Sequence, residues 1–406
     1  MKNGYLSQYF DGVAAKILSQ VEANILVSHQ HEFNGVDSLR KLLGTPPQKV
    51  KYNAKFMYFT DFDDEPIIEM GNLSWYDSRK NQSHRNPEYR LYFPTNTVTQ
   101  LANAGDIMIL AKQKENDELL LIIAEQETTI ASQLLWLFGF SSLEHPGFSV
   151  REELELDQNR IAFASRIILE NIGIEVEIGN ENFLDEMLKK FGGSFPSTRE
   201  FSEYARTTLK DIDFLSDYDG ALMDCYEREE ILFRTLEKHI IAERLSKGFS
   251  GTDYVDDFNQ FSLSIQNRRK SRAGLALENH LEFLFQKNKI RYNRNPITEN
   301  KSKPDFLFPG IKEYKDLTFN AINLTMLGVK STCKDRWRQV LTEANRIDVK
   351  HLLTLESAIS INQINEMKHN LLQLVVPQKL HSTYKPEQQD WIYTVSDFID
   401  LVKQKQ

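Results

Sequence analysis

The sequence predicts two kinds of fold in one chain, a β-rich N-terminal part followed by an α/β C-terminal part. Residues 51–124 hold five strand-like runs separated by Gly, Asn, Asp and Pro, a spacing typical of a small barrel or sandwich. From residue 303 onward, short apolar runs alternate with helical periodicity, which indicates an α/β sandwich with right-handed crossovers. A chain of 406 residues is long enough for two or three domains with separate cores.

The composition is that of an ordinary globular protein, with 41% hydrophobic and 26% charged residues. A net charge of −9 argues against a wholly basic surface but permits a local basic patch. Cys225 and Cys333 form neither a disulfide framework nor a zinc motif, so we expect a reducing, cytoplasmic environment. We expect no membrane association, because there is no signal-peptide pattern and the longest apolar run, 119–124, is too short to span a bilayer.

The N-terminal elements begin with residues 5–27, whose apolar residues recur at helical spacing and predict an amphipathic helix. The five strand-like runs that follow are AKFMYFTDF, PIIEMGNLSWYDS, EYRLYF, DIMILAKQ and ELLLIIAEQ. The apolar run 134–140 then predicts a packed helix or strand that ends at a glycine.

A loop at 78–90 mixes basic side chains with aromatic ones. The basic members are Arg79, Lys80, His84, Arg85 and Arg90, beside Trp75, Tyr76 and Tyr89. Basic groups mixed with aromatics are typical of a nucleic-acid surface. A solvated hairpin with a few charges is the alternative, and the pattern alone favours neither.

The segment GGSFPS at 192–197 contains strong helix breakers and is the expected hinge. We therefore predict an N-terminal domain at 1–150, a helical linker at 151–194 and a C-terminal domain at 195–406. The C-terminal domain opens with helical blocks at 201–215 and 228–248.

Two strand-like runs, 306–308 and 324–329, are bordered by Asp305 and Lys330, which can therefore share one edge of a sheet. A carboxylate can hold a divalent metal, and a lysine can steady a phosphate oxygen or an attacking hydroxide. The pair thus suits metal-assisted phosphodiester hydrolysis. From this spacing alone, a surface Asp and a surface Lys closing two ordinary strands is the favoured interpretation.

A helical period begins near residue 335 and carries Glu343 at the rim of its apolar stripe, from which it could lean over this sheet edge. A charged fork stands at the start of that helix: Lys334, Asp335 and Arg336, followed by Arg338. Such a fork can enter a major groove, where Arg or Lys bonds guanine and Asp bonds cytosine. Strand-like runs at 351–356 and 372–377, a helix between them and a helix at 395–402 complete the pattern.

The run NRRKSRAG at 267–274 concentrates four cations, Arg268, Arg269, Lys270 and Arg272. Such a run is usually a solvated face, but beside a nuclease core it would grip phosphates. In the helix predicted after it, Glu278 falls within the apolar stripe, where an unpaired charge is costly. Its partner would be an arginine on a structural interpretation, or a metal or its water shell on a functional one.

Three segments, GVKSTCKDRWRQVL, KPDFLFP and NRRKSRAGLALENHLEFLF, closely resemble the EcoRII-type restriction endonucleases, a branch of the PD-(D/E)xK nuclease superfamily. The resemblance runs from about Phe195 almost to the C-terminus. It implies a restriction-endonuclease-like domain in which a central mixed sheet is flanked by helices. It also implies that Glu278 is an active-site carboxylate, and Tyr314 matches a tyrosine near the family's active site, to which we assign no role.

By the same resemblance, Asp305, Lys330 and Glu343 are catalytic, Asp305 and Glu343 bind Mg²⁺, and the fork 334–336 reads bases. One residue departs from the wider superfamily: Gly328 stands two positions before Lys330, where an acid is usual. In this branch a helix glutamate takes that duty, and Glu343 is at the matching place.

The N-terminal part is similar to the effector domain of EcoRII-type enzymes, a pseudobarrel related to plant transcription-factor DNA-binding domains. With one inserted residue, the family's effector-binding run matches His84, Arg85, Asn86, Glu88 and Arg90. The segment SHQHEF at 28–33 matches a second contact loop and implicates His31, although a lone histidine is more often a satisfied surface or core residue.

The expected function is a Mg²⁺-dependent type II restriction endonuclease that cuts double-stranded DNA at a near-palindromic CCWGG-like site with CC/GG half-sites. We expect a homodimer through the catalytic domain and a second, effector DNA site in the N-terminal domain (type IIE behaviour). A catalytically silent DNA-binding repressor or modified-DNA sensor on the same fold is the alternative. A hydrolase of small phosphoesters is a third, disfavoured because two separate basic patches suit a polymeric anion.

Overall fold

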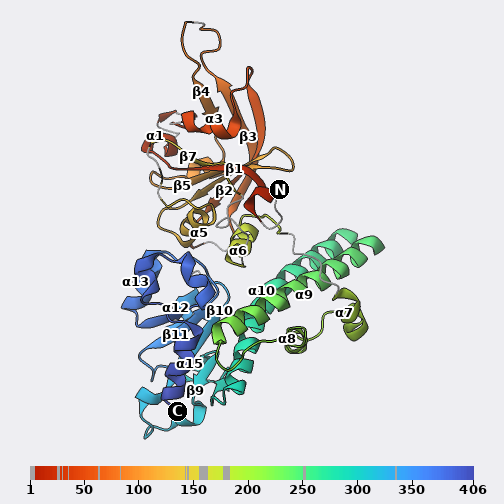
Figure 1. Ribbon diagram of the computed structural model, residues 1–406, viewed down its shortest axis with the longest axis vertical. Helices are drawn as coiled ribbons and strands as arrows, with labels where there is room; N and C mark the ends of the chain where they lie inside the picture. The colour runs from red at the N-terminus through yellow and green to blue at the C-terminus, as the bar shows by residue number, and fades with distance from the viewer. Residues whose placement is uncertain are drawn as a thin grey trace. The chain divides into compact units, whose positions relative to one another are not determined.

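A computed structural model describes residues 5–406 apart from 25–27, 30, 35, 63–64, 83, 142, 144–145, 155–162, 177–182, 250–252 and 334–335. Its contacts divide the chain into two units (Figure 1). The first comprises Met1–Glu175 and Ser357–Ile364, and the second comprises Val176–Glu356 and Asn365–Gln406. Among the described residues, no helix combines the length and the apolar character that crossing a membrane requires.

The first unit is built on a curled seven-stranded sheet of order β4-β3-β2-β6-β5-β1-β7. All neighbouring strands pair antiparallel except β2 and β6, which run parallel. The strands are β1 (Phe10–Ile17), β2 (Val50–Phe59), β3 (Ile67–Asp77), β4 (Tyr89–Tyr92), β5 (Ile107–Gln113), β6 (Leu119–Ala124) and β7 (Ser149–Arg151). The five strands predicted within 51–124 are therefore confirmed as β2 to β6, while the pseudobarrel stays a prediction.

The predicted helix at 5–27 is wrong over its central part, which is strand β1. Strand β1 lies between β5 and β7, and its residues Val13, Ala14 and Ala15 are fully buried. A strand covered on both faces needs a continuous apolar run, so it loses the alternation that would have distinguished it from a helix. Buried Lys16, at the end of this run, is paired with Glu22 at 2.6 Å.

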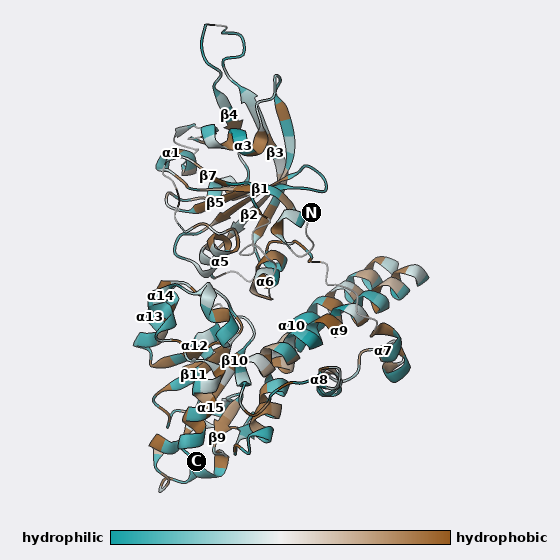
Figure 2. Cartoon of the chain, viewed as in Figure 1, coloured by the Kyte–Doolittle hydropathy of each residue, from teal (hydrophilic) through white to brown (hydrophobic). Residues whose placement is uncertain are grey.

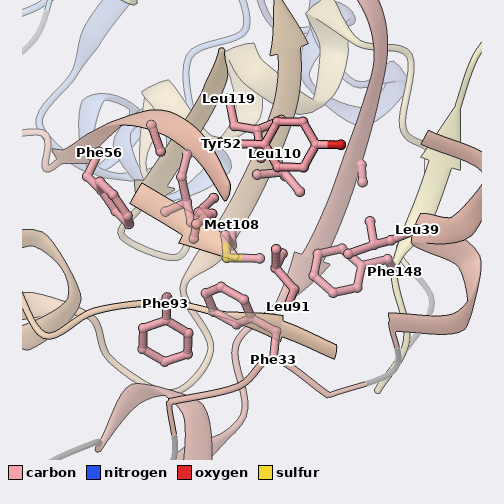
Figure 3. Close-up of a cluster of buried hydrophobic side chains, with 14 of the residues drawn as sticks. Phe33, Leu39, Tyr52, Phe56, Leu91, Phe93, Met108, Leu110, Leu119 and Phe148 are labelled. Carbon is pink, nitrogen blue, oxygen red and sulfur yellow. The ribbon is translucent and has the colours of Figure 1, made fainter. Parts of the chain in front are cut away.

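Aromatic and aliphatic side chains from most strands of this sheet meet in one core (Figure 3). Phe33 stacks on Phe93 with ring centroids 4.3 Å apart, and Phe148 meets Phe33 edge to face at 6.4 Å. The helices of this unit are α1 (Gln20–Ala23), α3 (Arg40–Leu43), α4 (Thr97–Leu101), α5 (Thr129–Leu137) and α6 (Phe163–Asn171). The run 134–140 is thus the end of helix α5, closed by Gly139 with a φ of 69°.

The second unit contains a mixed five-stranded sheet of order β12-β11-β10-β9-β8, as the sequence predicts. Strands β8, β9 and β10 pair antiparallel, whereas β10, β11 and β12 pair parallel. The strands are β8 (Asn293–Arg294), β9 (Phe306–Phe308), β10 (Thr325–Lys330), β11 (Lys350–Thr354) and β12 (Leu372–Val375). In Figure 2 the inner strands such as β2 are largely apolar, while β3, β4 and the helices carry both apolar and polar residues.

Helices surround this second sheet, with α10 in contact with β10 and α12 in contact with β11. Helix α13 (Ile361–His369) connects β11 to β12 and spans the division between the two units. The other helices are α7 (Leu184–Phe191), α8 (Thr198–Thr207), α9 (Tyr218–Lys247), α10 (Tyr254–Lys287), α11 (Ile311–Lys315), α12 (Trp337–Val340), α14 (Pro386–Gln389) and α15 (Val395–Gln404).

Two helices differ in extent from their predictions. The basic run 267–274 lies inside α10, which begins at Tyr254, and not before it. The helix predicted from residue 335 ends at Val340, and the turns after it include Ala344 with a φ of 49°. Because that value belongs to the left-handed region, the helical repeat that the sequence carries to residue 347 cannot continue as one helix.

The carboxylate of Asp219 ties the start of α9 to two later segments. It accepts hydrogen bonds from the backbone N–H groups of Gln378, Val395 and Ser396, each at 2.9 Å, and from the Ser396 hydroxyl at 2.6 Å. The side chain is buried, so these donors replace the water that it would otherwise bind.

We predict that Asp219→Ala lowers the free energy of unfolding by about 3 kcal/mol, because it leaves buried donors unpaired. Asp224→Ala is the matched control on the same helix, since Asp224 pairs with Lys379 at 2.6 Å on the surface. It should cost less than about 1 kcal/mol. Denaturant unfolding of the full chain measures both, and equal losses would contradict the role of Asp219.

A second prediction concerns pH and rests on His351 of β11, which is almost completely buried against Phe398 at 5.2 Å between ring centroids. Burial lowers the pKa of His351 to about 4, and the positive charge of Lys405 lowers it further. Between this value and about 6.5, the unfolded chain binds a proton that the folded chain does not. The stabilising contribution of neutral His351 is therefore fully present above that range and is lost as the pH falls through it.

The His351 contribution should amount to roughly 2 kcal/mol between pH 7.5 and pH 5. His351→Gln should lack this component, while His369→Gln, at an exposed position at the end of α13, should keep it. The measurement is the free energy of unfolding of the three proteins at both pH values. An identical pH slope in all three would show that His351 does not carry the effect.

Candidate active site

Asp305 and Lys330 meet where β9 and β10 pair. Asp305 immediately precedes β9, and its Oδ2 accepts hydrogen bonds from the backbone N–H of Val329 at 2.6 Å and from Lys330 Nζ at 3.1 Å. Antiparallel pairing of Leu327 with Phe306 fixes this register. The structure thus brings together the acid and the base that the sequence placed at two strand ends.

Glu343 lies in the turns after α12, half-buried, and its buried Oε2 has no hydrogen-bond partner among the described residues. Burial raises the pKa of Glu343 to about 7, and the negative charge of Asp305 contributes to the rise. The positive charges of Lys330 and Lys350 act in the opposite direction. Glu343 is therefore in electrostatic contact with the Asp305–Lys330 pair, although it is not on a helix as predicted.

Gly328, two positions before Lys330, stands where β10 and α12 pack closely. A Cβ atom at Gly328 would lie 2.8 Å from Val340 Cγ2 and 3.1 Å from Val340 Cγ1. No larger side chain fits there unless α12 moves away from β10. The absence of a side chain lets α12 pack close to β10, and the chain reaches Glu343 three residues after Val340.

Glu278 faces this site from α10, and burial followed by the negative charge of Asp305 raises its pKa. Its hydrogen-bond partner is Arg294, whose Nη2 lies 2.8 Å from Glu278 Oε2. Of the two interpretations for this buried acid, the structure thus contains the arginine. Sequence reasoning missed Arg294, although the apolar surroundings of Glu278 indicated that a cation had to lie nearby.

Asp305 and Glu343 fit a divalent cation. Among the described residues, Glu343 Oε2 has no hydrogen-bond partner, and the charge of Asp305 raises the pKa of both neighbouring glutamates, so a bound cation would relieve the repulsion between these carboxylates. Within the described part of the chain, no cluster of three or more Asp, Glu, His or Cys residues has a metal-binding arrangement. Two carboxylates completed by water and phosphate oxygens are nevertheless a usual environment for Mg²⁺.

Two arginines of the basic run on α10 are engaged within the domain. Arg269 forms hydrogen bonds from Nε to both carboxylate oxygens of Glu237 at 2.9 Å, and Arg272 is paired with Glu230. Arg272 is buried, and its guanidinium lies 4.3 Å from the ring centroid of Phe233. These contacts join α10 to α9, so Arg269 and Arg272 are not part of a solvated face, and their predicted contact with DNA phosphates stays a prediction.

Arg268 and Lys270 of the same run are exposed, and the Arg268 guanidinium lies 4.6 Å from the ring centroid of Phe195. Their predicted contact with DNA phosphates stays a prediction.

The predicted base-reading fork is described only in part, because Lys334 and Asp335 lie outside the described residues. Arg336 is exposed and donates from Nη2 to the hydroxyl of Thr332 at 2.7 Å. Arg338 is paired with Glu366 at 2.8 Å on the surface. Both arginines lie within ten residues of Lys330 along the chain.

In the first unit, the basic-aromatic loop carries a chain of surface ion pairs. Arg79 pairs with Glu88, and Arg90 pairs with Glu88 at 3.2 Å and with Glu32 at 2.6 Å. These contacts lie where β3 pairs with β4. They connect Arg79, Glu88 and Arg90, which the sequence proposed as DNA contacts.

The other predicted contacts of this loop, Lys80, His84, Arg85 and Asn86, are exposed. His31 is half-buried, with its ring 5.9 Å from the rings of both Tyr92 and Phe93 and with a buried Nδ1 that lacks a hydrogen-bond partner.

Comparison with known proteins identifies the C-terminal part of the chain. Residues 233–399 match the family model described as EcoRII C terminal. Over 206 residues the chain is 41% identical to the type II restriction enzyme EcoRII of Escherichia coli, covering 50% of each protein. It is 28% identical over 148 residues to the type II restriction enzyme SsoII of Shigella sonnei, covering 31% of this chain and 47% of SsoII. The chain therefore spans about half the length of these relatives.

Among solved structures, metal-depleted Ecl18kI in complex with uncleaved, modified DNA has a TM-score of 0.44 and 22% identity, covering 56% of this chain and 85% of Ecl18kI. The restriction endonuclease PspGI in complex with substrate DNA has a TM-score of 0.42 and 19% identity, covering 52% of this chain and 93% of PspGI. The match to the family model covers the second half of α9, all of α10, the mixed sheet and the acidic site. The chain is therefore similar to the type II restriction enzyme EcoRII over half of its length and matches the EcoRII C-terminal family model at residues 233–399.

Proposed function

We propose that the chain is a Mg²⁺-dependent, site-specific endonuclease of double-stranded DNA. The observation that carries this proposal is the contact of Asp305 with Lys330 beside Glu343, whose carboxylate has an unpartnered oxygen. Identity to EcoRII over the same half of the chain supports it.

In this proposal, Asp305 and Glu343 hold Mg²⁺, which supplies Lewis-acid assistance and a more acidic bound water. Lys330 lies against Asp305 and presents a positive charge where a phosphate would approach that carboxylate. This charge stabilises the negative charge that develops on the phosphate oxygens during attack. The hydrogen bond from Val329 to Asp305 keeps the acid in place while it acts.

For recognition, we propose that Lys334, Asp335 and Arg336 read CC/GG half-sites from the major groove, with Arg338 beside them. Arginine or lysine bonds guanine O6 and N7, while aspartate accepts from the cytosine amino group. A near-palindromic CCWGG-like site presents each half-site once per strand, so cutting both strands takes a homodimer. The position of Arg336, exposed and directly before α12, supports this role.

We further propose that the first unit binds a second DNA copy as an effector, which is type IIE behaviour. Four exposed residues in the basic-aromatic loop support it: Lys80, His84, Arg85 and Asn86. Beside them, Arg79 and Arg90 are held by Glu88, so their guanidinium groups are oriented before DNA arrives.

The direct test is to incubate plasmid DNA with the protein, with and without Mg²⁺, and to sequence the ends of any fragments. Mg²⁺-dependent ends at one short sequence would establish the activity and reveal the site. Sequence-specific binding without cleavage would instead favour a silent repressor or a sensor of modified DNA. Hydrolysis of small phosphoesters but not of DNA would favour a small-phosphoester hydrolase.

We predict that Lys330→Ala abolishes strand cleavage and leaves DNA affinity within about tenfold, because the lost charge acts mainly on the transition state. Glu343→Ala should behave in the same way. Lys379→Ala, which removes only a surface ion pair with Asp224, is the control and should cut normally. Single-turnover cleavage and a binding assay in Ca²⁺ separate the two effects, and normal cutting by Lys330→Ala would refute the catalytic assignment.

A further prediction separates base reading from phosphate binding. Arg336→Ala should cost about 1–3 kcal/mol of discrimination between cognate and random duplexes if Arg336 forms a bidentate contact with guanine. Arg268→Ala should weaken both duplexes alike and reduce the salt dependence of binding. Equal losses on both duplexes for both variants would show that Arg336 does not read bases.

The effector proposal predicts that the protein cuts DNA with several sites faster than DNA with one site. A short cognate duplex added in trans should restore cutting of the single-site substrate. The double variant Arg85→Ala with Arg90→Ala should lose this rescue and keep its catalytic residues. Equal rates on both substrates for the intact protein would refute the effector role.

A fragment beginning at residue 176 should cut without dependence on site number. This start keeps α7, whose Met187 is buried against Phe201, Tyr204 and Phe233 of the second unit. A folded but inert fragment would instead show that the first unit takes part in primary recognition.

A further inference from the structure

Arg294 connects helix α10 to the strand that leads out of Asp305. It lies in β8, where it pairs in register with Phe306 of β9, the residue directly after Asp305. The neighbouring Asn295 donates its backbone N–H to the Asp305 carbonyl at 3.0 Å. The backbone of Arg294 is therefore fixed relative to the catalytic aspartate.

The guanidinium of Arg294 binds three residues within about one turn of α10. Nε and Nη2 donate to Glu278 Oε2 at 3.1 and 2.8 Å, while Nη1 donates to Asn279 Oδ1 at 2.8 Å and to Glu282 Oε2 at 2.9 Å. Four of its five N–H donors are thus occupied by one helix. The side chain is only 18% exposed, which strengthens these charge-assisted bonds.

The three neighbouring carboxylates, Glu278, Glu343 and Asp305, differ in the groups that bind them. Glu278 has its charge compensated by a fixed protein cation, whereas Glu343 has a buried Oε2 without a hydrogen-bond partner. Asp305 is shared between Val329 and Lys330 on its Oδ2. Glu278 is held by a guanidinium that is itself bonded to Asn279 and Glu282, so it is less available to an incoming cation than Glu343 is.

We propose that Arg294 is a positioning residue that holds Glu278 on α10 and so withholds it from the divalent cation that Asp305 and Glu343 bind. The inference rests on the proposed function and deepens it, because it sets how many carboxylates the cation can recruit. Only a planar fork reaches all three acceptors on α10 at once, so an ammonium group in its place would hold Glu278 less firmly.

The test uses Mn²⁺ alone as the probe, bound by the full chain without DNA and followed by isothermal titration calorimetry at constant ionic strength. Arg294→Met should tighten Mn²⁺ binding by at least about fivefold, since it removes a positive charge and releases Glu278. Arg199→Met is the matched control, because Arg199 pairs with Glu282 at 2.7 Å but makes no recorded bond to Glu278. It should change the affinity by less than about twofold.

A double-mutant cycle separates positioning from a simple charge effect. Glu278→Gln should weaken Mn²⁺ binding by less than about threefold in the unaltered protein, but by at least about tenfold in the Arg294→Met background. Equal losses in both backgrounds would show that Arg294 contributes only its charge and would overturn the proposal. Unchanged affinity in Arg294→Met would overturn it as well.

Two further outcomes remain decisive. A loss above about tenfold on Glu278→Gln in the unaltered protein would make Glu278 a metal ligand and overturn the proposal, whether or not Arg294→Met folds. If Arg294→Met does not fold, Arg294→Lys takes its place in the cycle. Glu278→Gln should then weaken Mn²⁺ binding more in the Arg294→Lys background than in the unaltered protein. Failure of the unaltered protein to bind any Mn²⁺ would remove the proposed function and this inference together, whereas binding without coupling removes the inference alone.

Discussion

The hydrogen bond from the Val329 backbone to Asp305 Oδ2, at 2.6 Å, is the contact on which the candidate site depends. It makes a carboxylate part of the pairing between β9 and β10, so the acid cannot rotate away without losing a sheet contact. The same pairing carries Lys330 to the same oxygen. The side chain of Asp305 thus both supports the pairing of β9 with β10 and forms part of the candidate site. A shift in the register of these strands would remove the bond to Val329 and the contact with Lys330 together.

Close packing then determines which other residues can join this pair. With only hydrogen at Gly328, Val340 lies against β10, and the turns after α12 bring Glu343 into the electrostatic reach of Asp305. Helix α10 carries a further acid, Glu278, whose charge is compensated by Arg294. The acidic site is therefore built from a strand, a turn and a helix. Lys330 lies beside the carboxylate at the strand, and Arg294 lies beside the carboxylate on the helix.

The sequence predicted those parts of the fold in which a short apolar run has clear boundaries. The strands on both sides of Asp305 and Lys330 are examples, as is the helix between β11 and β12. It failed where two structures share one pattern: β1 is buried on both faces, so its apolar residues fit a helical period as well as a strand. It also failed at the end of α12, where the left-handed backbone at Ala344 interrupts a helical period that the sequence carries further.

The candidate site was predictable to a similar degree. The pairing of Asp305 with Lys330 follows from two strand ends, because neighbouring strands bring their ends together. The arginine that binds Glu278 could not be named, because it stands 16 residues further along the chain on a strand of two residues. Patterns of hydrophobic spacing do not report such a short strand, and its pairing with β9 is a purely tertiary contact.

The bonds of Asp219 have a consequence for the order of folding during synthesis. Helix α9 leaves the ribosome early, but the groups that satisfy its buried carboxylate come from residues up to 177 positions later. Until Ser396 has been made, the second unit would hold a buried charge without donors, or leave this region open to water. The fold is therefore completed by long-range contacts, which slow folding. A nascent chain that already contains Asp305, Lys330 and Glu343 would remain short of its final stability until its last helix begins.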